Sequence, residues 1–252
     1  HKYLTEGIEI TDFINGKTVY HTVKLIDFDN IKNNEFLVVN QLEIVEDDIK
    51  KIPDVIVYVN GIPLVCMELK STSREEVSIE DAYKQLMNYK EVHIPSLFYY
   101  NAFLVISDGV NTKAGTITAP FNRFMEWKKI NIEDEVKDTL GVNYKNLDTL
   151  LYGMFDKERF LDIIKNFILF IPKGKILAQY HQYYGMKKAI DSVINAVDND
   201  GRAGVVWHTQ GSGKSFSMTF LAGNLIKDKR LESPTILVIT DRNDLDDQLF
   251  ST

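Results

Sequence analysis

Short alternations of polar and apolar residues dominate residues 1–110 of the chain. Alternation with a period of two predicts β-strands, because successive side chains of a strand point to opposite faces of a sheet. Apolar residues at three- and four-residue spacing over residues 79–92 predict one helix among these strands. The pattern is typical of a small α/β or α+β domain. The predicted strands cover residues 18–28, 54–59, 64–70 and 97–107.

The pattern changes in the second half of the chain. Residues 111–131 are irregular and aromatic, and residues 147–170 carry Leu, Ile, Phe and Met at helical spacing, which predicts one or two helices. The Ile-Pro-Lys-Gly segment at 171–174 is the expected domain boundary. Beyond this boundary we predict the start of a parallel α/β sheet. Its elements are a buried strand at 203–207, a helix at 215–228 and a second strand at 235–239.

Composition narrows the class of protein. With 252 residues, 44% of them hydrophobic, the chain can form one large domain or two modest ones. It has no apolar run of about 18 residues and no basic-then-apolar start, so we expect neither a membrane span nor a secretory signal. The single cysteine, Cys66, cannot form an internal disulfide, which fits a reducing cytoplasm.

The net charge of −7 is unevenly distributed. Residues 1–171 contain 19 Lys and Arg against 27 Asp and Glu, whereas residues 172–252 contain 10 against 9. Tight DNA binding by a domain alone requires excess positive charge, because counterion release drives non-specific affinity. If the substrate is DNA, we therefore expect other components to help deliver it.

Residues 208–216, His-Thr-Gln-Gly-Ser-Gly-Lys-Ser-Phe, match a phosphate-binding loop. Glycines let backbone N–H groups close on phosphates, the lysine reaches the terminal phosphates, and the hydroxyl helps to hold magnesium. Gly211, Gly213, Lys214 and Ser215 supply these groups. His208 stands where the strict pattern has glycine, and the alternative interpretation is an ordinary glycine-rich turn before a helix. Because the chain ends at Thr252, soon after this loop, we expect it to be part of a longer motor protein.

A second set of residues suits metal-dependent cleavage of a phosphodiester. Asp54 follows Pro53, and Glu68-Leu69-Lys70 comes after a further 13 residues. Two carboxylates could hold Mg²⁺, which would stabilise phosphate charge and activate water, while Lys70 would position that water or neutralise developing charge. The alternative is a solvated strand face with no catalytic role.

Strand register tests whether these carboxylates can meet. A two-residue turn at Asn60-Gly61 with regular pairing would place Asp54 opposite Met67, on the wrong face for Glu68. We therefore predict either a three-residue loop or a β-bulge, which would place Asp54 opposite Glu68. The following helix carries Gln85 and Tyr89 on one face, where they either reach the carboxylates or simply form a helix surface.

Taken together, these motifs resemble the restriction (motor) subunit of type I restriction-modification enzymes. Asp54, Glu68 and Lys70 resemble the PD-(D/E)xK nuclease triad, and Gln85 and Tyr89 the Q-x-x-x-Y element of its RecB-like branch. The segment 107–120 also looks similar to the family. Residues 179–189 resemble the adenine-recognising element of superfamily 2 helicases, and residues 240–248 their DNA-tracking motif.

The resemblance implies an α/β nuclease domain at 1–130, a helical linker at 131–171 and the start of a RecA-like ATPase domain at 172–252. It implies ATP-dependent cleavage of double-stranded DNA, with methyltransferase and specificity subunits as partners, in a prokaryotic cytoplasm. Mg²⁺ would bind at Asp54 and Glu68, and ATP with Mg²⁺ would bind in the complete motor. The ATP-binding residues would be Gln182, Gln210, Gly211, Ser212, Gly213, Lys214 and Ser215, with Ser215 on the nucleotide's Mg²⁺. We do not expect the present residues to hydrolyse ATP by themselves.

Two other interpretations remain open at this point. A type III-like ATP-dependent nuclease would use the same motifs, and a DNA-binding or assembly module would use the carboxylates only structurally. His21, His93 and His181 are scattered and are expected to be structural. Trp207 is expected to lie in the core.

Overall fold

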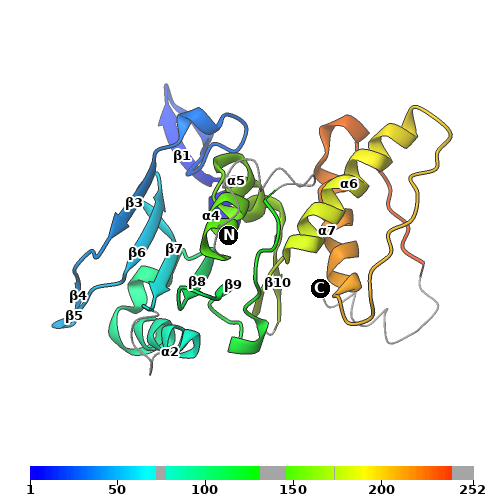
Figure 1. Cartoon of the computed structure of the whole chain (residues 1–252). Helices are drawn as coiled ribbons and strands as arrows, with labels where there is room; N and C mark the ends of the chain where they lie inside the picture. Colours follow the sequence, from blue (N-terminus) through cyan, green and yellow to red (C-terminus); the bar gives the residue numbers. More distant parts are fainter. Residues whose placement is uncertain (72–77, 131–145, 173, 240–252) are drawn as a thin grey trace.

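A five-stranded mixed sheet forms the centre of the first half of the protein (Figure 1). The computed structural model describes residues 1–71, 78–130, 146–172 and 174–239. The strand order is β3-β6-β7-β8-β9, with β7 and β8 parallel and the other neighbours antiparallel. The strands are β3 (Phe36–Asn40), β6 (Val55–Val59), β7 (Ile62–Leu69), β8 (Phe103–Ser107) and β9 (Thr112–Gly115).

The β6–β7 hairpin contains the register shift that the chemistry requires. Its turn has two residues, Asn60 and Gly61, both with positive φ (51° and 77°), so the predicted three-residue loop is wrong. The predicted bulge is confirmed: Tyr58 pairs with Pro63 but Val57 pairs with Val65, which leaves Leu64 as the extra residue. A two-residue turn of this type matches the twist of the strands, and the bulge then re-aims every later side chain.

The two faces of this sheet pack against different helices. Along β8, Phe103 and Val105 contribute to one buried cluster, whereas Leu104 and Ile106 contribute to another. The second cluster, which we call the α2 face, includes Ala82 and is covered by α2. The first cluster is covered by α4 and α5. These helices are α2 (Ile79–Asn88, continued by a π-turn at Tyr89–His93), α4 (Asn146–Met154) and α5 (Lys157–Asn166).

Most predicted elements of the first half are present, with shifted bounds. The helix predicted at 79–92 is confirmed. The strand predicted at 18–28 ends at Val23, and the strand predicted at 97–107 begins only at Phe103, because a 3₁₀ turn at Pro95–Phe98 precedes it. Pro95 begins this 3₁₀ turn and has no backbone N–H to donate to a neighbouring strand, so the segment does not pair as a strand there. The other elements are α1 (Lys2–Glu6), β1 (Ile8–Ile14), β2 (Lys17–Val23), β4 (Ile44–Glu46), β5 (Ile49–Lys51) and 3₁₀ turns at Ile31–Asn33 and Phe121–Arg123.

Two helices and a hairpin connect the halves of the molecule. The spacing at 147–170 predicted one or two helices, and two are present, α4 and α5, with Asp156 capping α5 through the N–H of Arg159 at 3.1 Å. The hairpin of β10 (Ile168–Ile171) and β11 (Gly174–Leu177) follows. The expected domain boundary at 171–174 falls in its turn. The cluster that includes Val57 and Phe160 also includes Phe220, so one buried core crosses this position.

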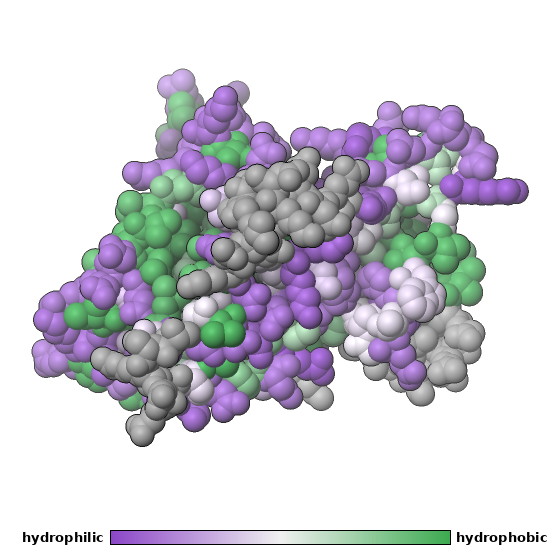
Figure 2. All heavy atoms as spheres, in the orientation of Figure 1, coloured by the Kyte–Doolittle hydropathy of each residue, from purple (hydrophilic) through white to green (hydrophobic). Residues whose placement is uncertain are grey.

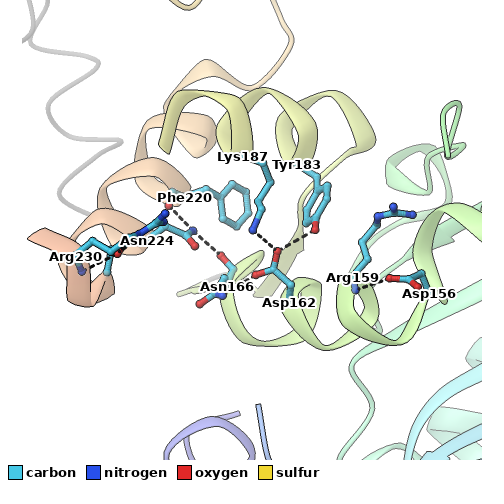
Figure 3. A network of polar contacts seen from close by, with 10 residues as sticks. Asp156, Arg159, Asp162, Asn166, Tyr183, Lys187, Phe220, Asn224 and Arg230 are labelled. Atoms are coloured by element: carbon cyan, nitrogen blue, oxygen red, sulfur yellow. Dashed lines mark hydrogen bonds and ion pairs between the residues drawn. The ribbon is translucent and has the colours of Figure 1, made fainter. Parts of the chain in front are cut away.

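The second half is built on two helices, α6 (Tyr180–Val197) and α7 (Lys214–Lys227), and a 3₁₀ turn follows at Lys229–Leu231. Polar contacts hold α5 against α6 (Figure 3). Asp162 accepts hydrogen bonds from the Tyr183 hydroxyl at 2.9 Å and from Lys187 Nζ at 3.0 Å. Asn224 of α7 donates to the carbonyl oxygen of Asn166 at 3.3 Å. The helix predicted at 215–228 is thereby confirmed and placed against α5.

The two strands predicted beside the glycine-rich loop at 208–216 are wrong. Residues 202–209 and 234–239 have no helix or strand assignment. Val205 is 94% exposed, Leu237 is 81% exposed, and Trp207, expected in the core, is 79% exposed. A strand is stable only when a neighbour pairs with its backbone groups, and these segments have no strand partner among the described residues. The DNA-tracking motif expected at 240–248 lies outside the described residues.

Apolar side chains also reach the surface in the half that carries α6 and α7 and over the outer strand β3 (Figure 2). Leu37 and Val38 of β3 are 50% and 64% exposed. In the part of the chain that the structure describes, no helix has the length and apolar character needed to cross a bilayer.

Candidate functional site

The bulge brings the two predicted carboxylates to the same place on the α2 face. Asp54 directly precedes β6, and extending the Val55–Met67 pairing by one residue places it opposite Glu68. An Asp54 carboxylate oxygen, Oδ2, accepts a hydrogen bond from the backbone N–H of Leu69 at 2.8 Å. This contact fixes Asp54 to the strand that carries Glu68. Glu68 itself is 2% exposed, whereas Asp54 is half-buried, so the acid pair lies where the buried part of the sheet meets its surface.

Lys70 connects the acid pair to helix α2. Its Nζ donates to Glu68 Oε1 at 2.8 Å and to the side-chain oxygen of Gln85. Gln85 in turn donates through Nε2 to the Tyr89 hydroxyl at 2.6 Å. The side chains of Lys70, Gln85 and Tyr89 therefore form one continuous hydrogen-bonded chain, and Gln85 and Tyr89 belong to the site instead of a solvated helix surface.

Burial sets the protonation of Glu68. Removal from water raises the pKa of this carboxyl to about 7, and the nearby Asp54 carboxylate acts in the same direction, while Lys70 opposes the shift. Burial, together with the two acids, also raises the pKa of the Cys66 thiol, which packs beneath them on the α2 face. Burial also raises the pKa of the Tyr89 hydroxyl. At this site burial therefore favours the neutral forms of Glu68, Cys66 and Tyr89.

One oxygen of this site has no partner. Glu68 Oε2 is buried and accepts no hydrogen bond, although Oε1 is bound by Lys70. A buried carboxylate oxygen without a partner is costly, and a cation would remove that cost. Within the described ranges, no cluster of three or more His, Cys, Asp or Glu side chains is arranged to hold a metal. Two carboxylates fit Mg²⁺ when water or phosphate oxygens complete its shell.

The glycine-rich loop turns through two glycines before it enters α7. Gly211 and Gly213 have φ values of 80° and 76°, a left-handed conformation that favours glycine, and Gly213 directly precedes α7. Lys214 Nζ donates to the carbonyl oxygens of His208 at 3.2 Å and Thr209 at 3.0 Å. The ammonium group therefore folds back over the loop. Gln210, Ser212 and Ser215 lie in the same loop and the first turn of α7.

Gln182 contacts this loop from helix α6. Its Nε2 donates to the carbonyl oxygen of Gly213 at 3.0 Å, and its Oε1 accepts from the backbone N–H of Gln179 at 3.0 Å. Gln182 is 3% exposed, so both ends of its side-chain amide are used within the protein. The structure thus brings Gln182 to the loop, while its role as an adenine contact stays a prediction.

A cavity of about 350 Å³ adjoins both Gln182 and the loop. One wall comes from Gln182, Gly211, Gly213 and Phe216, and β11 contributes a second. Further lining residues come from the first half of the chain, a contribution that sequence analysis missed because it lies in the irregular aromatic segment. Those residues include Gly115, Thr116, Thr118, Arg123, Glu126 and Trp127.

The histidines divide into two groups. His181 lies beside His208, with ring centroids 5.4 Å apart, and its Nε2 is 3.2 Å from the carbonyl oxygen of Ser212. Burial, with help from His181 and Lys214, lowers the pKa of His208. His21 lies in the exposed β1–β2 hairpin and His93 at the end of the π-turn after α2. His181 therefore contacts the glycine-rich loop, whereas His21 and His93 lie apart from it in the sequence and in the element order.

The fold and these sites define a class of protein: a mixed α/β sheet that carries a pair of acids, one of them buried, followed by a glycine-rich loop at the start of a helix. Comparison with protein families agrees with this order. Residues 1–123 match the family described as type I restriction enzyme R protein N terminus, and residues 181–252 match the SWI2/SNF2 ATPase family.

Individual relatives agree with these family matches. The chain is 44% identical, over its whole length, to the type I restriction enzyme HindI endonuclease subunit of Haemophilus influenzae. It is 38% identical, again over its whole length, to MjaIXP of Methanocaldococcus jannaschii, a candidate type I restriction enzyme endonuclease subunit. The matched regions are 24% and 26% of these relatives, so the chain spans about a quarter of their length. The chain belongs to the R subunits of type I restriction enzymes and corresponds to their N-terminal part.

Proposed function

We propose that residues 1–130 form a PD-(D/E)xK-type nuclease domain that hydrolyses double-stranded DNA with Mg²⁺ held by Asp54 and Glu68. The observation that carries this proposal is the buried, unpartnered Oε2 of Glu68 beside a second carboxylate. A bound Mg²⁺ would supply charge neutralisation for the phosphate and a water of lowered pKa. The relatives' names, which specify type I restriction endonuclease subunits, support this substrate class over a type III-like enzyme or a non-catalytic module.

The protein's own side chains would divide the work. Asp54, held by the N–H of Leu69, keeps its carboxylate in one orientation. Lys70 would give up part of its contact with Glu68 to bind the attacking water or a phosphate oxygen. Gln85 and Tyr89 would hold Lys70 in place during that exchange, because the Gln85 side chain contacts both. In the reaction, the oxygen of water bonds to phosphorus and its proton passes to solvent. The bond from phosphorus to the leaving deoxyribose oxygen breaks, and that oxygen takes a proton from solvent.

We propose further that residues 172–252 belong to a RecA-like ATPase of the superfamily 2 type. Phosphate oxygens would replace the carbonyl oxygens that Lys214 Nζ now contacts, Ser215 would help hold the nucleotide's Mg²⁺, and the cavity beside Gln182 would receive the base. In the whole protein, ATP-driven translocation would precede cleavage. Methyltransferase and specificity subunits would select the DNA, and the assembly would work in the cytoplasm.

A Mn²⁺ soak with anomalous scattering tests the nuclease proposal. We expect a peak at about 2.0 to 2.3 Å from oxygens of both Asp54 and Glu68, near Lys70. The peak should disappear in Glu68→Gln and persist in Glu46→Gln, whose carboxylate instead accepts hydrogen bonds from Ser96. An accessible site without a peak would favour a DNA-binding or assembly module.

Lys214→Ala tests the nucleotide proposal separately. The variant should lose binding of fluorescent ATP analogues, because the ammonium that would contact the terminal phosphates is gone. Lys187→Ala, which removes a lysine of α6 bound to Asp162, serves as the matched control and should retain binding. Equal binding by wild type and Lys214→Ala would leave the loop as an ordinary glycine-rich turn.

A further inference from the structure

A lysine outside the acid site, Lys113, lies on the α2 face in line with the acid pair. Glu68 of β7 pairs with Ile106 of β8, and Ile106 pairs with Lys113 of β9. Directly paired residues of neighbouring strands project to the same face of a sheet. Lys113 therefore lies on the face that carries Asp54 and Glu68, at the same level along the strands.

The spacing between Glu68 and Lys113 follows from the sheet. Neighbouring strands lie about 4.8 Å apart, so two strand intervals separate the backbones of these residues by about 10 Å. Duplex DNA rises about 3.4 Å per nucleotide of each strand. A DNA strand with its scissile phosphate at Glu68 would thus bring another phosphate, within about three nucleotides, to Lys113.

The charge of Lys113 is not neutralised by a carboxylate within the described part of the chain. Its Nζ lies 5.1 Å from the centre of the Phe121 ring, and no ion pair is formed with a described acid. Nearby lysines differ: Lys84 pairs with Asp81, and Lys90 pairs with Glu91. An aromatic ring holds a cation in place but leaves its charge available for an anion.

We propose that Lys113 binds a DNA backbone phosphate within about three nucleotides of the scissile one and so positions the DNA strand at the acid pair. Lys113 is a positioning residue, because it would hold the substrate without touching the reacting atoms. This inference rests on the proposed nuclease function, and it supplies positive charge at a domain that is acidic as a whole. Because backbone contacts carry no sequence information, Lys113 would act equally on any cleavage sequence.

Lys165 of α5 offers a matched control. Its Nζ lies 5.2 Å from the centre of the Phe28 ring, so it has the same kind of aromatic contact as Lys113. Both side chains belong to half-exposed residues. Lys165 is carried by α5, which packs on the opposite face of the sheet from Lys113. Replacing either lysine with glutamine removes one charge and one cation–π contact, but only one of them changes the α2 face.

The test measures binding of a short fluorescent DNA duplex by the 252-residue chain, at low salt with EDTA, as fluorescence anisotropy over a salt series. Lys113→Gln should weaken binding about tenfold and lower the slope of log affinity against log salt by about one. Lys113→Arg should restore the slope, because it keeps the charge. Lys165→Gln should match wild type. Mn²⁺ binding, measured separately without EDTA, should be the same in all three variants.

Each contrary result has a definite meaning. Unchanged affinity and slope in Lys113→Gln would overturn the proposal, as would an equal loss in Lys165→Gln or wild-type binding that does not depend on salt. Loss of Mn²⁺ binding in Lys113→Gln would also overturn it, because the variant would then have disturbed the sheet itself. A different result is that the wild-type chain binds DNA through Lys113 but does not bind Mn²⁺. That result would contradict the proposed nuclease function and would still support the DNA contact of Lys113.

Discussion

The acid pair and the glycine-rich loop differ in how well the segments beside them are paired and buried. Asp54 and Glu68 lie on a sheet whose strands are all paired, above a core in which Ile56 and Leu104 are fully buried. The glycine-rich loop lies between Trp207 and α7, and the apolar residues before it are exposed. Both regions have strong apolar runs in their sequences. The difference shows that an apolar run becomes a strand only when another strand meets it.

Backbone hydrogen bonding explains why the helices of both regions form. A helix satisfies its own N–H and C=O groups, so α7 forms at the predicted place beside unpaired segments. A strand depends on groups supplied by a neighbour. In the second half, α6 and α7 are held instead by side-chain contacts to α5, through Asp162 and Asn224 (Figure 3).

The largest effect should come from truncating the shared core. Phe160 of α5 is 1% exposed and stacks on Phe155, so Phe160→Ala should lower the free energy of unfolding by about 3 to 5 kcal/mol. Trp207→Ala, at a 79% exposed position, should change it by no more than about 0.5 kcal/mol. Urea denaturation measures both. A comparable loss in Trp207→Ala would mean that the segment before the loop is packed after all.

Metal binding at the acid pair should depend on pH. Because the pKa of Glu68 is raised to about 7, a proton must leave before this carboxylate can bind a cation. Mn²⁺ affinity should rise about tenfold per pH unit below about pH 7 and become constant above it. Titration calorimetry at several pH values tests this dependence. The other titratable side chains that face the Glu68 carboxyl are Asp54, Lys70, Cys66 and Tyr89. An affinity that is flat across this range would contradict the raised pKa.

The same pKa shift should affect the metal-free fold. The folded pKa of Glu68 lies above its ordinary value of 4.5, so the folded state holds the proton more tightly than the unfolded state. Stability from this group is therefore full below about pH 4.5 and is lost as the pH rises to about 7. Glu68→Gln cannot ionise, so the difference in unfolding free energy between wild type and variant should change over this window and stay constant above it.

A smaller effect distinguishes two glycines of the loop. A Cβ at Gly213 would lie 2.8 Å from Gln182 Nε2, whereas a Cβ at Gly211 would meet nothing within 4 Å. Both have positive φ, so each alanine substitution should cost about 1 kcal/mol in backbone strain. Gly213→Ala should cost more and also displace Gln182. Equal unfolding free energies for the two variants would show that Gln182 moves without cost.

The smallest effect should come from one hydroxyl at the junction. Tyr183→Phe removes the hydrogen bond to Asp162 but leaves Asp162 paired with Lys187, so the loss should be about 1 kcal/mol. A double-mutant cycle with Lys187→Met isolates the coupling between the two contacts. Additive losses would show that the Asp162 contacts act independently in joining the two regions.

Sequence alone determined the features that depend on local spacing. Period-two and period-3.6 patterns placed β6, β7, α2, α5 and α7, and the motifs identified Asp54, Glu68, Lys70, Gln85 and Tyr89 before any of them had been brought together. The need for a longer loop or a bulge also followed from counting residues, because the two carboxylates must share a face and a one-residue shift moves a side chain to the other face. The comparisons agree with the family that these motifs resemble.

Only the tertiary structure decided the features that depend on distant partners. It leaves one oxygen of Glu68 without a partner and raises the pKa of this carboxyl, because the sheet and α2 together exclude water from it. It aligns Lys113 with the acid pair through two strand pairings that no local pattern encodes. It also leaves Val205 and Leu237 exposed, since an apolar segment cannot specify the strand that would cover it. Local spacing fixes which residues can meet, whereas packing decides which of them do.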